Sequence, residues 1–126
     1  TVIQKMEDKI MKIIENKKHF LHCNVAGFSY HCGCEVFDQM KIGSKLRLIR
    51  EDENQFDKNA VAVFFGDTHI GYLPKNSNEQ VAMLLELGYE DIFDARVQTL
   101  DPEAHPEEQV GMIIFVKRAE KRTKKA

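Results

Sequence analysis

The sequence predicts a mostly β fold, a small closed or nearly closed barrel of five or six strands with one inserted helix. Short β-type runs separated by turn residues fill the chain from His19 to Gly111. Their connections are short enough for hairpins, which favours a barrel over a parallel α/β sheet. With 126 residues, 43% of them hydrophobic and 30% charged, the chain can bury one hydrophobic core and has a globular composition.

Local patterns indicate the individual strands. Residues 45–48 alternate polar and apolar side chains, as a half-buried strand does. Residues 59–65 form an almost unbroken apolar run, and the turn Gly66-Asp67 follows it, so this run and the next predict a hairpin. Pro74 cannot donate to a strand pairing and ends the second strand of that hairpin. The strands are expected within residues 20–30, 45–48, 59–65, 68–73, 93–100 and 110–116.

An amphipathic helix is expected at the N-terminus, in residues 1–18. Apolar residues recur there at spacings of three, four and three, which places them on one face of a helix. They are Ile3, Met6, Ile10 and Ile13. This face either packs against the main body or meets a partner helix or a second copy, since one short apolar stripe can serve either purpose.

The inserted helix is expected over residues 76–87. Asn76 or Ser77 can cap it, with Glu79 or Gln80 at the capping-box spacing. Gly88 is a suitable residue to end it.

The net charge of −2 is unevenly distributed along the chain. Residues 1–18 carry +2, residues 117–126 carry +5, and residues 19–116 carry −9. An acidic body with a basic tail differs from the even basic surface of a nonspecific nucleic-acid binder. We therefore divide the chain into an N-terminal helix (1–18), a main domain (19–117) and a basic tail (118–126).

The cysteine content and the absence of membrane signals favour a cytoplasmic protein. The chain has three cysteines, Cys23, Cys32 and Cys34, whereas a secreted domain of this size usually has an even number. No apolar run reaches the roughly 20 residues of a membrane helix, and the charged start does not resemble a signal peptide. We expect reduced thiols, a cytoplasmic location and no contact with a membrane.

Catalytic motifs are absent, so we expect no enzyme activity, no catalytic residue and no cofactor. The sequence has no glycine-rich phosphate loop and no Gly-x-Ser-x-Gly elbow. Six potential zinc ligands lie within sixteen positions, but their spacing matches no closed structural site, so structural or incidental roles are favoured over metal binding. These residues are His19, His22, Cys23, His31, Cys32 and Cys34.

The most informative segment is residues 50–63, a polar loop that leads into a buried strand. Asn54, Asp57 and Asn59 can each bond to nearby backbone groups. Phe56 is the aromatic residue of this loop, lies just before the buried strand, and is expected to be exposed. The alternative is an ordinary loop whose aromatic ring tucks into the core.

Three blocks of the sequence resemble a HIRAN domain. They are Val25-Ala26-Gly27-Phe28-Ser29-Tyr30-His31, Asn54-Gln55-Phe56-Asp57-Lys58-Asn59-Ala60 and Ile70-Gly71-Tyr72-Leu73-Pro74-Lys75. The resemblance extends over residues 20–116 and implies an OB-like β-barrel, in agreement with the strand count. HIRAN domains occur at the N-terminus of SNF2-type fork-remodelling ATPases and as small standalone bacterial proteins, which this chain looks like. In characterised eukaryotic members the domain binds the 3′-hydroxyl end of single-stranded DNA.

The resemblance also implies which residues would contact DNA. Phe56 would stack on a base, and Asp57 would accept a hydrogen bond from the terminal hydroxyl, where a carboxylate would repel a phosphate. The other implied contacts are Tyr30 and His31 beside the nucleotide, Tyr72 lining the pocket, and Lys58 and Lys75 at phosphate. Ser29 lies where the DNA-binding members carry an arginine, and His31 where they carry a phenol.

The leading hypothesis is a non-catalytic module that binds single-stranded DNA, preferentially at a free 3′-hydroxyl end. Two alternatives remain open. One is a protein-interaction module that uses the N-terminal apolar stripe and the acidic body, with a vestigial DNA pocket. The other is an accessory subunit of a helicase or nuclease whose catalytic centre lies on another chain.

Overall fold

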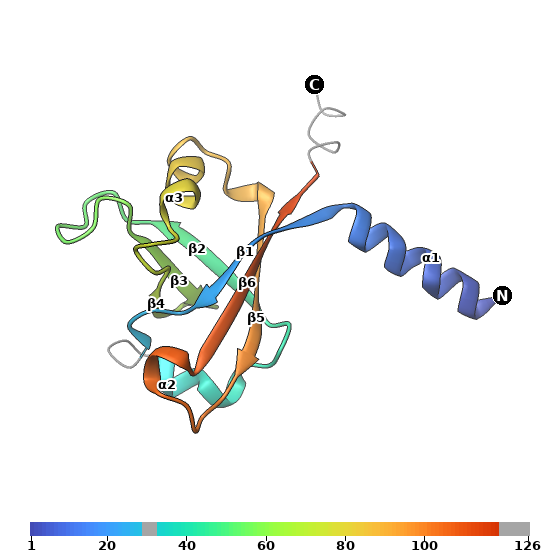
Figure 1. The fold of residues 1–126 in the computed structure, drawn as a ribbon, viewed down its shortest axis with the longest axis horizontal. Coiled ribbons are helices and arrows are strands. Elements are labelled where there is room, and N and C mark those ends of the chain that lie inside the picture. Colours follow the sequence, from blue (N-terminus) through green and yellow to red (C-terminus); the bar gives the residue numbers. More distant parts are fainter. Residues whose placement is uncertain (29–32, 119–126) are drawn as a thin grey trace.

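A computed structural model describes residues 1–28 and 33–118, with the backbone alone for residues 9–15, 33 and 34. Within these ranges the chain forms one six-stranded antiparallel sheet and three α-helices (Figure 1). The strands are β1 (Lys17–Asn24), β2 (Lys45–Arg50), β3 (Val61–Phe65), β4 (Thr68–Tyr72), β5 (Phe93–Leu100) and β6 (Val110–Lys117). The helices are α1 (Val2–Glu15), α2 (Gly33–Val36) and α3 (Glu79–Glu86).

The sheet curls until its two edges nearly meet. The strand order is β1-β6-β5-β2-β3-β4, so β1 and β4 are the edges. Just beyond β1, Ala26 bridges to Tyr72 at the end of β4. The Ala26 amide donates to the Tyr72 carbonyl over 2.8 Å, and the Tyr72 amide donates to the Ala26 carbonyl over 2.9 Å. This bridge leaves an incompletely closed, OB-like barrel and confirms the predicted fold class.

Alternating side chains fill the interior of the barrel. On β2, Leu46 and Leu48 are buried between exposed neighbours, as the alternation in the sequence predicts. Strand β3 begins with three buried residues because both of its faces are covered. Aliphatic side chains from β3, β4 and β6 complete the core, including Val61, Val63, Ile70, Met112 and Ile114.

The helices differ in detail from the sequence prediction. Helix α3 begins at Glu79, with Asn78 at its N-cap position rather than Asn76 or Ser77. The amide of Ser77 donates to the carbonyl of Pro74, so residues 74–77 form a turn that delays the helix. The short helix α2 was not predicted, because four residues are too few for a recognisable apolar period.

Helix α1 extends away from the barrel (Figure 1). The apolar side chains of its first half, Val2, Ile3 and Met6, are exposed. The expectation that this apolar face packs on the main body is therefore wrong for the side chains that the structure describes. Among the described residues, no helix is long and apolar enough to cross a membrane.

Candidate nucleic-acid interface

The backbone brings described parts of the three sequence blocks together. The segment that leads into residue 29 is held against β4 by the Ala26–Tyr72 bridge. The hydroxyl of Tyr72 donates to Oε1 of Glu51 over 2.8 Å, which joins β4 to the loop of residues 51–59 between β2 and β3. Residues far apart in the sequence therefore form one continuous surface at this end of the barrel.

Hydrogen bonds fix the conformation of the 51–59 loop. The guanidinium of Arg50 donates to the carbonyls of Glu51, Lys58 and Ala60, which clamps the two ends of the loop. Inside the loop, Oδ1 of Asn54 accepts the amides of the second and third residues after it, over 2.8 and 3.0 Å. This is the side-chain turn that asparagine commonly makes, so the loop is held in one shape.

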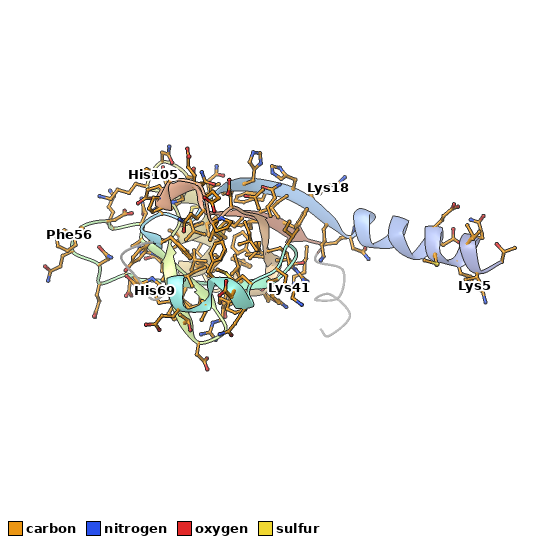
Figure 2. The ribbon with its side chains drawn as sticks, turned by 90° about the horizontal axis from the view of Figure 1, so that it is seen from below. Lys5, Lys18, Lys41, Phe56, His69 and His105 are labelled. Atoms are coloured by element: carbon orange, nitrogen blue, oxygen red, sulfur yellow. The ribbon has the colours of Figure 1, made fainter. Side chains whose placement is uncertain are left out.

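The tip of this loop presents an aromatic ring to solvent. Phe56 is 86% exposed, which confirms the expected exposure, and the alternative of an ordinary loop whose aromatic tucks into the core is wrong. Nζ of Lys75 donates to the carbonyl of Phe56 over 3.2 Å and brings a cation to the backbone of the loop tip. Phe56 lies at the end of the molecule opposite helix α1, which carries Lys5 (Figure 2). An exposed ring on a fixed loop can stack on a flat ligand at little entropic cost.

Asp57 points back from the loop towards helix α3. Its Oδ1 accepts the amide of Asn59 over 2.9 Å, and its Oδ2 accepts from Nδ2 of Asn78 over 2.8 Å. Asn78 is only 1% exposed, so its amide needs such an acceptor. Each carboxylate oxygen has a further lone pair, and Asp57 is half-buried rather than enclosed, so it can accept one more hydrogen bond.

The electrostatic setting of this surface is mixed. The 51–59 loop contains four acidic residues and one lysine, and Arg50 and Lys75 flank it. Desolvation and the hydrogen bond to the Glu51 carboxylate raise the pKa of Tyr72, so its hydroxyl is a donor at neutral pH. The surface therefore combines hydrogen-bond acceptors and donors with a few cations, unlike an evenly basic groove.

The structure describes five of the eight implied contact residues. Ser29, Tyr30 and His31 lie outside the described residues. The five described residues all lie in the 51–59 loop or contact it. Phe56, Asp57 and Lys58 belong to the loop, and the side chain of Lys58 is exposed. Tyr72 bonds to Glu51, and Lys75 bonds to the carbonyl of Phe56.

Sequence reasoning missed the residues that support this surface. Arg50, Glu51 and Asn78 were not singled out, although each bonds to the loop or to Tyr72. Asn78 carried a detectable signal, since an asparagine just before a helix commonly has a local hydrogen-bonding role. Arg50 carried none, because its partners are backbone carbonyls that only the folded loop brings together.

The cluster of histidines and cysteines is only partly described. His31 and Cys32 lie outside the described residues, and burial raises the pKa of the Cys23 thiol to about 11, which disfavours the thiolate that metals require. His19 and His22 approach to 3.0 Å on the exposed face of β1. Among the described side chains, no three of the types His, Cys, Asp and Glu group as metal ligands.

The fold and this surface define a small OB-like binding module. The chain belongs to the HIRAN domain family, whose model matches residues 18–119. HIRAN domains are DNA-binding modules rather than catalytic domains. Among curated proteins, none matches the chain in sequence.

Two solved structures share the fold. A protein from Lactobacillus plantarum superposes with a TM-score of 0.67 at 22% identity, over 81% of this chain and 97% of that one. The HIRAN domain of human HLTF superposes with a TM-score of 0.54 at 18% identity, over 87% of this chain and 88% of the other. Helix α1 lies wholly before the residues that the family model matches.

Proposed function

We propose that this chain is a non-catalytic module that binds single-stranded DNA, preferentially at a free 3′-hydroxyl end. The observation that carries the proposal is the 86% exposed ring of Phe56 on a loop fixed by hydrogen bonds. Base stacking on an aromatic ring is worth about 1–3 kcal/mol and does not depend on the base. Because the chain belongs to a DNA-binding family, we propose a DNA base as the ligand of this exposed ring.

The preference for a hydroxyl end depends on Asp57 in this proposal. A carboxylate accepts hydrogen bonds and cannot donate them, so it favours a hydroxyl and repels a phosphate at the same position. Lys75, which contacts the carbonyl of Phe56, is proposed to meet the phosphate on the 5′ side of the terminal nucleoside. Tyr30, His31, Lys58 and Tyr72 are proposed as further contacts, and Ser29 as the position at which the arginine of other members is replaced.

Titration with three fluorescent single strands tests the proposal. The strands share one sequence and end in a 3′-hydroxyl, a 3′-phosphate or a blocked 3′ carbon. The hydroxyl strand is expected to bind about ten- to a hundredfold more tightly than the phosphate strand, because a charge-assisted hydrogen bond is worth about 1.5–3 kcal/mol. Equal affinity for all three strands would overturn the end preference.

Phe56→Ala provides the matching test of stacking. It should weaken binding of all three strands alike, because a base stacks on the ring whatever the end group. Ile42→Ala is the control, since Ile42 is also an exposed apolar side chain but lies in the loop at the other end of β2. Loss of affinity in the Ile42 variant as large as in the Phe56 variant would contradict a specific role for the ring.

A protein-interaction or accessory module is the second candidate function. The exposed apolar face of α1 favours it, because Val2, Ile3 and Met6 lie outside the residues matched by the family model. In this alternative the partner is a DNA-processing helicase or nuclease, and the end pocket is vestigial. It becomes the leading interpretation if the wild-type protein binds none of the three strands.

A further inference from the structure

A strip of side chains leads away from Tyr72 across the outer face of the sheet. It consists of Arg47 on β2, Phe64 on β3 and His69 on β4. The guanidinium carbon of Arg47 lies 5.5 Å from the centre of the Phe64 ring. The Phe64 and His69 rings stack with centres 5.1 Å apart and planes 17° apart, and the centre of His69 lies 4.9 Å from that of Tyr72.

A β-bulge brings this strip together. His69 and Tyr72 are three residues apart, and in a regular strand their side chains would lie on opposite faces. The pairing of β3 with β4 shifts register between Val63 and Phe64, so β4 has one extra residue there. The shift puts both rings on the outer face, and a contact of 2.8 Å between Nε2 of His69 and the Gly71 carbonyl fixes the imidazole.

The strip ends at a groove beside β2. Strand β2 pairs with β5 only at Lys45 and Leu46, and a groove of about 920 Å³ is lined by residues of both strands. Arg47 belongs to the strip and also lines the groove, together with three other basic residues and three acidic ones. These are Lys45, Arg50, Lys117, Asp67, Glu90 and Asp91. The strip therefore joins the proposed end site at Tyr72 to a groove of mixed charge, in which Lys45 and Arg47 are the cations of the first half of β2.

We infer that Arg47 is the centre of a second nucleic-acid subsite, which binds the strand on the 5′ side of its terminal nucleotide. This inference rests on the proposed function, because it takes single-stranded DNA as the ligand. The guanidinium of Arg47 is exposed and backed by Phe64, so its outer side offers a flat cation to a base or a phosphate. Phe64 and His69 are positioning residues that keep this cation in place.

The ordinary alternative is that these side chains only stabilise the sheet. Cross-strand aromatic pairs do so without any ligand. That role predicts a loss of stability in variants but no dependence on the length of a bound strand and no change in the salt dependence of binding. Strand length and salt therefore separate the two roles.

The experiment measures the affinity of oligothymidines of about three, six and twelve nucleotides, each with a 3′-hydroxyl or a 3′-phosphate. The wild-type protein should bind the longer strands more tightly with either end group. Arg47→Gln should weaken binding of the twelve-nucleotide strand about tenfold and leave the three-nucleotide strand unchanged. It should also reduce the salt slope by about 0.7, the value for one phosphate contact on a single strand.

Two further variants complete the design. Phe64→Leu keeps an apolar side chain but removes the flat support, so it should reproduce part of the Arg47→Gln loss on long strands only. Lys41→Gln is the control, because Lys41 is an exposed cation in the loop before β2 that does not line the groove (Figure 2). The inference is overturned if Arg47→Gln and Lys41→Gln affect the long strand equally, or if wild-type affinity does not rise with length.

The two proposals fail separately in this experiment. Loss of end discrimination with a length effect that depends on Arg47 would reject the end site and retain the subsite. End discrimination without a length effect would retain the end site and reject the subsite.

Discussion

The buried amide of Asn78 donates to the carboxylate of Asp57 over 2.8 Å and ties the 51–59 loop to the start of helix α3. A residue proposed to accept the terminal hydroxyl of DNA therefore also supports the loop that carries Phe56. This double role changes how variants must be chosen, because removing the Asp57 side chain would disturb stability and binding together.

Asn78→Ala should lower stability by about 1–3 kcal/mol, the range for a lost hydrogen bond to a charged group. Truncation of this buried side chain also leaves a small gap at the start of α3. Urea unfolding followed by circular dichroism measures the change, with Asn76→Ala, an exposed asparagine in the preceding turn, as the control. An equal effect of both variants would show that the bond to Asp57 contributes nothing.

Asp57→Asn should remove the preference for a hydroxyl end over a phosphate end. The asparagine retains an acceptor oxygen but carries no charge, so the phosphate strand should gain affinity relative to the hydroxyl strand. The measurement is the ratio of the two dissociation constants in the variant and in the wild type. Asn78→Ala serves as the stability-matched control, because it loosens the same loop but keeps the charge. If both variants retain the wild-type ratio, Asp57 has a structural role alone.

Much of the fold was predictable because its signals are local. Strand β5 occupies the predicted residues 93–100, and the hairpin of β3 and β4 turns at Gly66-Asp67 as expected. Alternation and turn residues specify such features within a few positions. The exposed position of Phe56 could also be expected, since this residue lies in a polar loop just before the buried strand.

The support of the candidate site could not be predicted, because its contacts are long-range. The strip from Arg47 to Tyr72 depends on an extra residue in β4, and a period-two pattern places His69 on the wrong face. The bond between Tyr72 and Glu51 joins residues 21 positions apart. Sequence periodicity carries no information on either contact.

Asp94 connects the start of β1 to β5 and should make stability depend on pH. It is almost completely buried and forms ion pairs with Lys17 and Arg96. Burial alone would raise the pKa of its carboxyl, but the hydrogen bonds from both cations and their attraction outweigh burial and hold the pKa below its ordinary value. A depressed pKa stabilises the fold above the unfolded-state pKa of about 4, and this contribution is lost as the pH falls through the lower folded-state value.

Asp94→Asn should therefore reduce the free energy of unfolding by about 1–3 kcal/mol at pH 7. The difference from the wild type should shrink as the pH falls below about 4, the unfolded-state pKa, and disappear below the lower folded-state pKa of Asp94. Urea unfolding from pH 7 down to pH 3 measures it. Asp67→Asn, at an exposed turn position, is the control and should follow the wild-type curve. A difference that does not change with pH would contradict the assignment to ionised Asp94.

Gly71 sits where the two edges of the barrel meet, and its lack of a side chain permits their contact. A Cβ at this position would lie 2.4 Å from the carbonyl oxygen of Ala26 and 2.5 Å from Cγ1 of Val25. Both distances are far below van der Waals contact, and the backbone of Ala26 cannot yield without breaking its two hydrogen bonds to Tyr72. Gly71→Ala should therefore open the bridge between the barrel edges and displace Tyr72 from the proposed site.

The expected loss of stability in Gly71→Ala is about 1–3 kcal/mol, as for other overpacked sites. Amide hydrogen exchange of Ala26 and Tyr72 should become faster, because the hydrogen bonds that protect these two amides are the ones that open. Gly66→Ala is the matched control: its φ of +59° strains an alanine, but a Cβ there meets no atom within 4 Å. Gly66→Ala should lower the free energy of unfolding by about 1 kcal/mol. The amide of Ala26 should keep its protection from hydrogen exchange relative to the other amides of the barrel. Unchanged exchange at both amides in Gly71→Ala would mean that the edges can separate and re-pair around the new methyl group, so that glycine would not be required for closure.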